Sequence, residues 1–180
     1  FARRIAGRSP APAGELRVTT NDTLISHYLS PTFARFIAAY PEISLDIVVT
    51  NRSLNLSKRD ADVAIRPTDT PPETLVGRRL ATLGWAFYGR RADFVDDEDI
   101  DERELFVRNW VSLGDTFGNM KVVRFLREQV QPERIVYKIN TVLGLAEAVE
   151  AGIGIGALPC FIADKRPGLT RLTGPHSDFS

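Results

Sequence analysis

The side chains best suited to binding a small molecule stand where predicted strands give way to helices. Most carry hydroxyl or amide groups, and an arginine follows one of the strands. Hydroxyls, arginine and the amides at a helix N-terminus all bind anions such as carboxylates. A capping or turn role that stabilises the local backbone is the competing interpretation of each residue. The candidate ligand-binding residues are Thr19, Thr20, Asn21, Arg66, Ser112, Thr116, Asn140, Thr141 and Pro159.

The sequence contains no residue set that indicates catalysis. A hydrolytic triad needs a nucleophile with a positioned base, and the histidines His27 and His176 are isolated and far apart. Neither histidine has the spacing of a zinc ligand. We therefore expect a protein that is not an enzyme, holds no metal and uses no cofactor.

Two features could suggest a nucleotide or redox site, and both have simpler interpretations. Gly152, Gly154 and Gly156 resemble a dinucleotide loop, but that motif follows a strand and opens a helix. Here the glycines follow a predicted helix and enter a strand, so nucleotide binding is not expected. Cys160 is the single cysteine, and a redox sensor usually needs a resolving partner. A passive role is therefore expected for this thiol.

Composition limits the classes of partner. The chain has 180 residues, 43% of them apolar, which is enough to bury a core. Lys plus Arg equals Asp plus Glu at 23 each, whereas a domain that binds nucleic acid by itself usually has a basic excess. No apolar run approaches the length of a membrane span, and the basic start is not a signal peptide. We expect a cytoplasmic protein that binds neither DNA nor a membrane through this chain.

Strand and helix patterns alternate along the chain, which predicts an α/β fold with parallel sheets and helices outside them. Between Leu24 and Tyr40, Ser30 is expected to cap a fresh helical segment at Pro31. The predicted strands are 15–19, 43–50, 62–66, 75–83 running on into 84–88, 110–113, 134–139, 153–158 and 169–172. The predicted helices are 24–40, 54–59, 119–130 and 141–150.

Four segments, in this order, are similar to the effector-binding domains of LysR-type transcription regulators. The order and spacing match across nearly all of the chain after residue 14. The segments are Gly14 to Val18 after a Pro-rich linker, Phe33 to Phe36 running into Tyr40 to Leu45, Asp60 to Arg66, and Glu147 to Pro159 followed by Gly168 to Leu172.

The resemblance implies a two-lobed fold like that of the type II periplasmic binding proteins. Each lobe is a small sheet flanked by helices, and crossover strands join the lobes beside a ligand-binding cleft. By this resemblance, residues 1–13 are the end of a linker helix and a linker, 14–83 are lobe I, 84–172 are lobe II, and 173–180 are a truncated return toward lobe I.

The resemblance also implies a function, which is to sense a small-molecule effector, such as an organic anion, in the cleft. The family forms homodimers, with tetramers in the full-length protein, and it contacts DNA only through an N-terminal helix-turn-helix domain absent from this sequence. The candidate dimer contacts are Tyr28, Phe36, Ile37 and Tyr40. Two alternatives stay open, which are a periplasmic solute-binding protein of a transporter and an enzyme built on a two-lobed fold.

Overall fold

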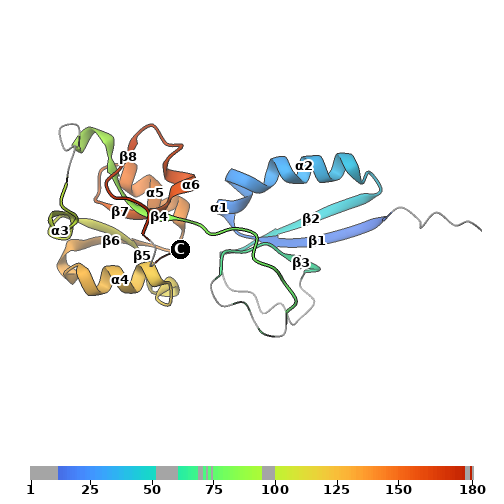
Figure 1. The fold of residues 1–180 in the computed structure, drawn as a ribbon, viewed down its shortest axis with the longest axis horizontal. Coiled ribbons are helices and arrows are strands. Elements are labelled where there is room, and N and C mark those ends of the chain that lie inside the picture. Colours follow the sequence, from blue (N-terminus) through green and yellow to red (C-terminus); the bar gives the residue numbers. More distant parts are fainter. Residues whose placement is uncertain are drawn as a thin grey trace, which may run out of the picture. The chain divides into compact units, whose positions relative to one another are not determined.

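The chain forms two compact units, Phe1–Val76 (unit 1) and Gly77–Ser180 (unit 2). A computed structural model describes residues 12–51, 61–68, 71, 73, 75–94, 100–176 and 179. Both units are of the α/β type that the sequence predicts, with small sheets and flanking helices (Figure 1). Residues 76–84 have no regular secondary structure, and the lobe boundary between residues 83 and 84 stays a prediction.

Unit 1 contains a parallel three-stranded sheet with the strand order β2-β1-β3. Because the strands are parallel, their carboxyl ends lie at one edge of the sheet, where Thr20 pairs with Val49. Asp62, next to this sheet, accepts a hydrogen bond from the Arg17 amide at 2.8 Å. The strands are β1 (Gly14–Thr20), β2 (Ile43–Val49) and β3 (Val63–Ala64).

One continuous helical segment connects β1 with β2 and lies along the unit 1 sheet (Figure 1). Its parts are α1 (Asp22–Leu24), a π-helical turn (Ile25–Leu29) and α2 (Ser30–Ala39). The prediction that Ser30 caps a fresh helix is wrong, because Ser30 already lies inside the continuous helix. Its hydroxyl donates back to the Ile25 carbonyl oxygen at 2.8 Å, which is a bond within the helix and not a cap.

Unit 2 combines two small sheets that meet at a single bridge. One sheet is antiparallel, with the order β7-β4-β8, and the other pairs β5 with β6 in parallel. Trp110 bridges Ile155 in parallel, and the Val111 amide donates to the Ile155 carbonyl oxygen at 2.8 Å. The strands are β4 (Trp85–Arg90), β5 (Trp110–Leu113), β6 (Ile135–Ile139), β7 (Gly156–Pro159) and β8 (Leu169–Arg171). The expectation of parallel sheets throughout is therefore wrong for β4.

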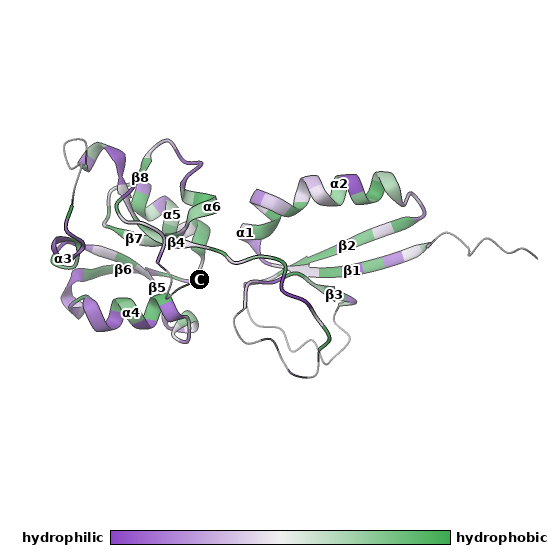
Figure 2. Ribbon diagram, viewed as in Figure 1, coloured by the Kyte–Doolittle hydropathy of each residue, from purple (hydrophilic) through white to green (hydrophobic). Residues whose placement is uncertain are grey.

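The helices of unit 2 bury one face each. In Figure 2, α4 carries hydrophobic and hydrophilic residues in alternating patches, as an amphipathic helix does. Its buried side chains are Val122, Val123 and Leu126. The helices are α3 (Glu102–Leu105), α4 (Lys121–Gln129), α5 (Val142–Glu150) and α6 (Cys160–Ala163).

The main hydrophobic core lies in unit 2 and is rich in aromatic rings. The rings of Phe87 and Trp110, both fully buried, meet edge to face with centroids 4.9 Å apart, an arrangement that aromatic pairs favour. The Trp110 indole donates to the Leu105 carbonyl oxygen at 2.8 Å. Trp85 is 8% exposed and belongs to this core.

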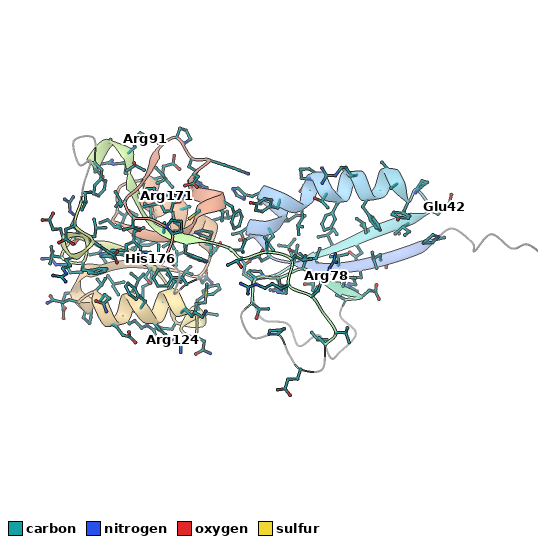
Figure 3. All side chains as sticks on the ribbon, in the orientation of Figure 1. Glu42, Arg78, Arg91, Arg124, Arg171 and His176 are labelled. Carbon is teal, nitrogen blue, oxygen red and sulfur yellow. The ribbon has the colours of Figure 1, made fainter. Side chains whose placement is uncertain are left out.

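The segment after β8 runs beside β4. The Leu172 amide donates to the Phe87 carbonyl oxygen at 2.8 Å, and the His176 amide donates to the Trp85 carbonyl oxygen at 2.9 Å. The His176 ring stacks on Phe179, with centroids 4.6 Å apart, inside unit 2 (Figure 3). The return of residues 173–180 toward lobe I stays a prediction.

Two further element predictions have clear outcomes. The strand predicted over 75–83 is wrong, because this stretch pairs with no described strand and Val76 and Leu80 are exposed. The short helix predicted over 54–59 lies outside the described residues. None of the described helices is long and apolar enough to span a bilayer.

Candidate functional site

The candidate residues of unit 1 gather at the carboxyl edge of its parallel sheet. Thr19 and Thr20 end β1, Asn21 follows them, and Arg66 lies two residues after β3. The Thr50 amide, just past β2, donates to the Thr20 carbonyl oxygen at 3.0 Å. Ligands of open α/β sheets bind at this edge, where the loops that follow the strands converge.

Arg66 links the ends of the strands through its guanidinium group. Nη1 donates to the Thr19 hydroxyl at 3.2 Å, and Nη2 donates to the Thr50 carbonyl oxygen at 2.6 Å. Burial lowers the pKa of Arg66 below its ordinary value, yet an arginine stays protonated in proteins. The group therefore brings a positive charge to this edge of the sheet.

Asn21 begins the helical segment that follows β1. Its side-chain oxygen accepts a hydrogen bond from the Leu24 amide at 3.0 Å, which is an N-cap. Asn51 supports the same turn, because its side-chain amide donates to the Asp22 carboxylate at 2.9 Å. The local capping role expected as the alternative for Asn21 is thus present, and a ligand contact by Asn21 stays a prediction.

Thr20 differs from its neighbours in unit 1. The residue is fully buried, and its hydroxyl oxygen has no hydrogen-bond partner among the described residues. A buried hydroxyl without a partner costs free energy, and such groups are uncommon in native proteins.

The candidate residues of unit 2 also lie at strand ends. Ser112 and Pro159 lie at the carboxyl ends of β5 and β7, and Asn140 directly follows β6. The Gly114 amide donates to the Ile139 carbonyl oxygen at 2.8 Å, which joins the ends of β5 and β6. The sheet pairings and the parallel bridge therefore bring these candidates to one edge of unit 2.

Exposure varies among these unit 2 candidates. Ser112 is 4% exposed, and its hydroxyl donates to the Leu113 carbonyl oxygen at 3.2 Å. Thr116, in a 3₁₀ turn after β5, and Asn140 are exposed. Pro159 is buried and precedes α6.

Thr141 occupies the N-cap of α5, as predicted, but its side chain makes no capping hydrogen bond to the helix. The first-turn amides of α5 therefore lack a side-chain cap, and such amides favour an anion. A methyl group at Gly144 would come within 2.4 Å of Ile139 Cδ1 and 2.9 Å of Thr141 Cγ2. The glycine thus allows the start of α5 to lie close to the end of β6.

A hydrogen-bonded group under α6 fixes the end of β7. The buried Tyr88 hydroxyl lies 2.7 Å from Asp164 Oδ1 and accepts a hydrogen bond from Arg171 Nε at 3.1 Å. Burial, together with the bond to Asp164, raises the pKa of Tyr88 far above its ordinary value. The neutral phenol therefore persists at every ordinary pH and anchors the helix that begins at Cys160. The Cys160 amide also donates to the Gly84 carbonyl oxygen at 2.9 Å.

The structure thus brings the unit 1 candidates together at one edge and the unit 2 candidates together at another. Sequence reasoning missed Thr50, Asn51 and Gly144. Asn51 could have been found by its position directly after a predicted strand, as Asn140 was. In the described part of the chain, no group of three or more His, Cys, Asp or Glu side chains could hold a metal ion.

Comparison with known proteins gives a family match over nearly the whole chain. Residues 9–180 match the family model described as the LysR substrate binding domain. Over 72 residues, 40% of this chain and 21% of the relative, the chain is 39% identical to an HTH-type transcriptional regulator of Xanthomonas campestris pv. campestris. Over 161 residues, 87% of this chain and 52% of the relative, it is 25% identical to the probable HTH-type transcriptional regulator LtrA of Klebsiella pneumoniae. The chain therefore spans about half, or less, of the curated relatives it matches.

Solved structures share the fold. CrgA, a LysR-type transcriptional regulator from Neisseria meningitidis, has a TM-score of 0.73 at 23% identity, over 94% of this chain and 59% of that one. The effector binding domain of QuiR in complex with shikimate has a TM-score of 0.74 at 14% identity, over 93% of this chain and 85% of that one. Identities this low support a common fold and leave the ligand of this chain open.

Proposed function

The chain belongs to the LysR substrate binding domain family, and we propose that it is the effector-sensing and dimerisation domain of a LysR-type DNA-binding transcription regulator. The match over residues 9–180 carries this proposal. The α/β fold of each unit supports it. DNA binding belongs to an N-terminal helix-turn-helix domain outside the residues of this chain.

The proposed ligand is a small organic anion. Unit 1 offers hydroxyl, amide and guanidinium groups at one sheet edge, and unit 2 offers hydroxyls, an amide and the uncapped start of α5. This set suits a carboxylate with further oxygen atoms. The QuiR domain binds shikimate, a hydroxylated carboxylate, which is consistent with this class. The proposed contacts are Thr19, Thr20, Asn21, Arg66, Ser112, Thr116, Asn140, Thr141 and Pro159.

The proposed mechanism is a shift between two arrangements of the lobes. An effector that binds one arrangement more tightly increases its population, and equal affinity for both would change nothing. The homodimer then transmits the arrangement to the DNA-binding domains, and the full-length protein is proposed to form a tetramer.

Exposed apolar side chains on the helical segment of unit 1 support the proposed homodimer. Tyr28 is 49% exposed, Ile37 is 46% exposed and Tyr40 is 43% exposed. Exposed large apolar side chains of this kind are available for contact with a second copy of the chain. Phe36, the fourth predicted contact, is half-buried, and its ring centroid lies 5.0 Å from that of Tyr40.

A regulator of this kind acts in the cytoplasm and catalyses no reaction. The curated relatives are named as transcriptional regulators, which does not favour the solute-binding or the enzymatic alternative. Cytoplasmic location and the absence of catalysis in this chain remain parts of the proposal.

A thermal-shift screen tests the proposed ligand class. We expect at least one small carboxylate among shikimate, benzoate and succinate to raise the melting temperature, by an amount that grows with the logarithm of its concentration once this exceeds Kd. The matched controls are the neutral amides of the same compounds, which should shift it less. If no small carboxylate of a broader set raised the melting temperature, the cleft assignment would be wrong.

A further inference from the structure

The outer side of α4 bears an open groove that none of the candidate residues described above line. The groove lies within unit 2 and has a volume of about 200 Å³. A cavity of roughly 150 Å³ can hold a benzene molecule, so the groove has room for one aromatic ring with small substituents. Its lining residues are Lys121, Arg124, Phe125, Glu128 and Phe179.

Four of the lining residues come from one face of α4. Lys121, Arg124, Phe125 and Glu128 stand at positions i, i+3, i+4 and i+7, which adjoin one another on the surface of an α-helix. The three charged side chains are exposed, and Phe125 is half-buried; Figure 3 labels Arg124 on this helix. The groove therefore follows the side of the helix opposite to its buried residues.

Phe125 and Phe179 form the apolar wall of the groove. Their ring centroids lie 5.0 Å apart with an angle of 65° between the rings. Phe179 is only 7% exposed, and the ring of His176 stacks on it with centroids 4.6 Å apart. Because the wall is held by the aromatic core behind it, a further ring can pack against it at little cost in side-chain ordering.

The amino end of the groove is positively charged. Lys121 opens α4, Arg124 lies one turn later, and the first turn has neither an acidic residue nor a side-chain cap. Cations at the start of a helix oppose its dipole, whereas an anion there is stabilised by the dipole and by the cations together. The Arg124 guanidinium forms no hydrogen bond or ion pair with any described residue. This end of the groove therefore suits a carboxylate.

The other end of the groove has the opposite charge. Glu128 lies four residues after Arg124 on the same helix face, which is about 6 Å further along the axis. An ionised carboxylate accepts hydrogen bonds and donates none. A ligand that fits both ends thus carries its negative charge at one end, a flat apolar ring in the middle and a hydrogen-bond donor at the far end.

We propose that this groove binds a small aromatic carboxylate with a hydroxyl group at the far end of its ring, such as 4-hydroxybenzoate. The carboxylate lies between Lys121 and Arg124, the ring packs against the two phenylalanines, and the hydroxyl donates to Glu128. The proposal is independent of the function proposed above, because the groove shares no residue with the sheet edges assigned to the effector.

An NMR titration of the chain with 4-hydroxybenzoate tests the site. We expect the backbone amide signals of Lys121 to Glu128 and of Phe179 to shift and to saturate together. The neutral 4-hydroxybenzamide and the non-donating 4-methoxybenzoate should bind more weakly. Shifts confined to the strand ends around Thr20 and Thr141 would overturn the groove and support the proposed function, and absence of shifts in α4 would overturn the groove alone.

Surface substitutions on α4 separate specific binding from general attraction of anions. Arg124→Gln should weaken binding of 4-hydroxybenzoate about fivefold or more, because a charged hydrogen bond is lost. Arg127→Gln is the matched control, since Arg127 does not line the groove and pairs with Asp115 at 2.7 Å, and it should change binding less than about twofold. Equal losses in the two variants would overturn the proposal.

Glu128→Ala tests the orientation of the ligand. It should remove most of the preference for 4-hydroxybenzoate over 4-methoxybenzoate and leave the affinity for benzoate unchanged or higher, because a like charge is removed. An undiminished preference in this variant would contradict the assigned contact between Glu128 and the hydroxyl.

Two further titrations decide between the proposed ligand and other occupants of the groove. If inorganic phosphate shifted the α4 amides at the same concentrations as 4-hydroxybenzoate, the aromatic wall would contribute nothing and the ligand class would be wrong. If these amides shifted with protein concentration alone, a second copy of the chain would cover the groove and the proposal would be overturned. Insensitivity to both is the result that we expect.

Discussion

The Tyr88 hydroxyl lies 2.7 Å from Asp164 Oδ1, which connects the central strand of the antiparallel sheet to the helix that follows β7. Arg171, on β8, donates to the same phenol oxygen and pairs with the same carboxylate. One buried phenol thus joins β4, β8 and the residue that follows α6.

Replacing Tyr88 with Phe should lower the free energy of unfolding at neutral pH by about 1–3 kcal/mol, because Asp164 and Arg171 each lose a hydrogen-bond partner. Urea denaturation measures this change. Tyr137→Phe is a suitable control, since that side chain is 38% exposed. Equal effects of the two substitutions would contradict the role assigned to the buried phenol.

Tyr88 should also contribute to the loss of stability at alkaline pH. Its pKa in the folded state is raised above the unfolded value of about 10. The stabilisation is therefore complete below about pH 10 and is lost as the pH rises further, because only the unfolded chain releases the proton. The alkaline fall in stability, followed between pH 8 and 11, should be smaller in Tyr88→Phe than in the wild type. A parallel fall in both proteins would argue against this linkage.

Gly154→Ala should destabilise unit 2 by about 1–3 kcal/mol through overpacking. A methyl group there would lie 2.6 Å from the Asn109 carbonyl oxygen and 3.1 Å from the Trp110 nitrogen, and both are backbone atoms. The strand leading into β7 would have to move away from β5. Gly77→Ala is the control, because nothing lies within 4 Å of its added methyl group, and it should leave the thermal midpoint unchanged or raise it slightly. A Gly154→Ala protein as stable as the wild type would rule out the close packing.

Ile37→Glu should convert the proposed homodimer into a monomer, because it places a charge at an exposed apolar side chain that is a proposed dimer contact. Size-exclusion chromatography with light scattering measures the mass directly. Val107→Glu, at a side chain that is 65% exposed and lies in unit 2, should leave the dimer intact. A wild-type monomer, or a dimer that persists in Ile37→Glu, would exclude α2 from the interface.

The strongly periodic parts of the fold could be predicted from the sequence. Strands such as β2 and helices such as α4 have a clear spacing of apolar residues, and the structure contains both close to the predicted bounds. The segment from Leu75 to Leu83 looked equally extended, but a strand exists only where a partner strand completes its hydrogen bonds. No sequence pattern indicates whether that partner is present.

The sequence indicated where the candidate residues lie in the fold but not which hydrogen bonds they make. Residues at strand-to-helix junctions, such as Thr19 and Asn21, could be selected because the topology brings strand ends together. The bond from Arg66 to the Thr50 carbonyl oxygen depends on packing between segments that are distant in sequence, and so does the absence of a partner for Thr20. Adjacent identical residues have no local signal that could distinguish them. The π-helical turn before Ser30 could not be predicted from the sequence either, because Pro31 is compatible with the start of a new helix and with a continuous helix.

The pairing of β4 has a consequence for synthesis on the ribosome. Both of its neighbours in the sheet, β7 and β8, come from the last part of the sequence. Protein synthesis adds about 5–20 residues per second. The apolar segment Trp85 to Tyr88 therefore leaves the exit tunnel several seconds before the strands that pair with it. During that time the nascent chain exposes an unpaired aromatic stretch, which is the kind of segment that chaperones protect.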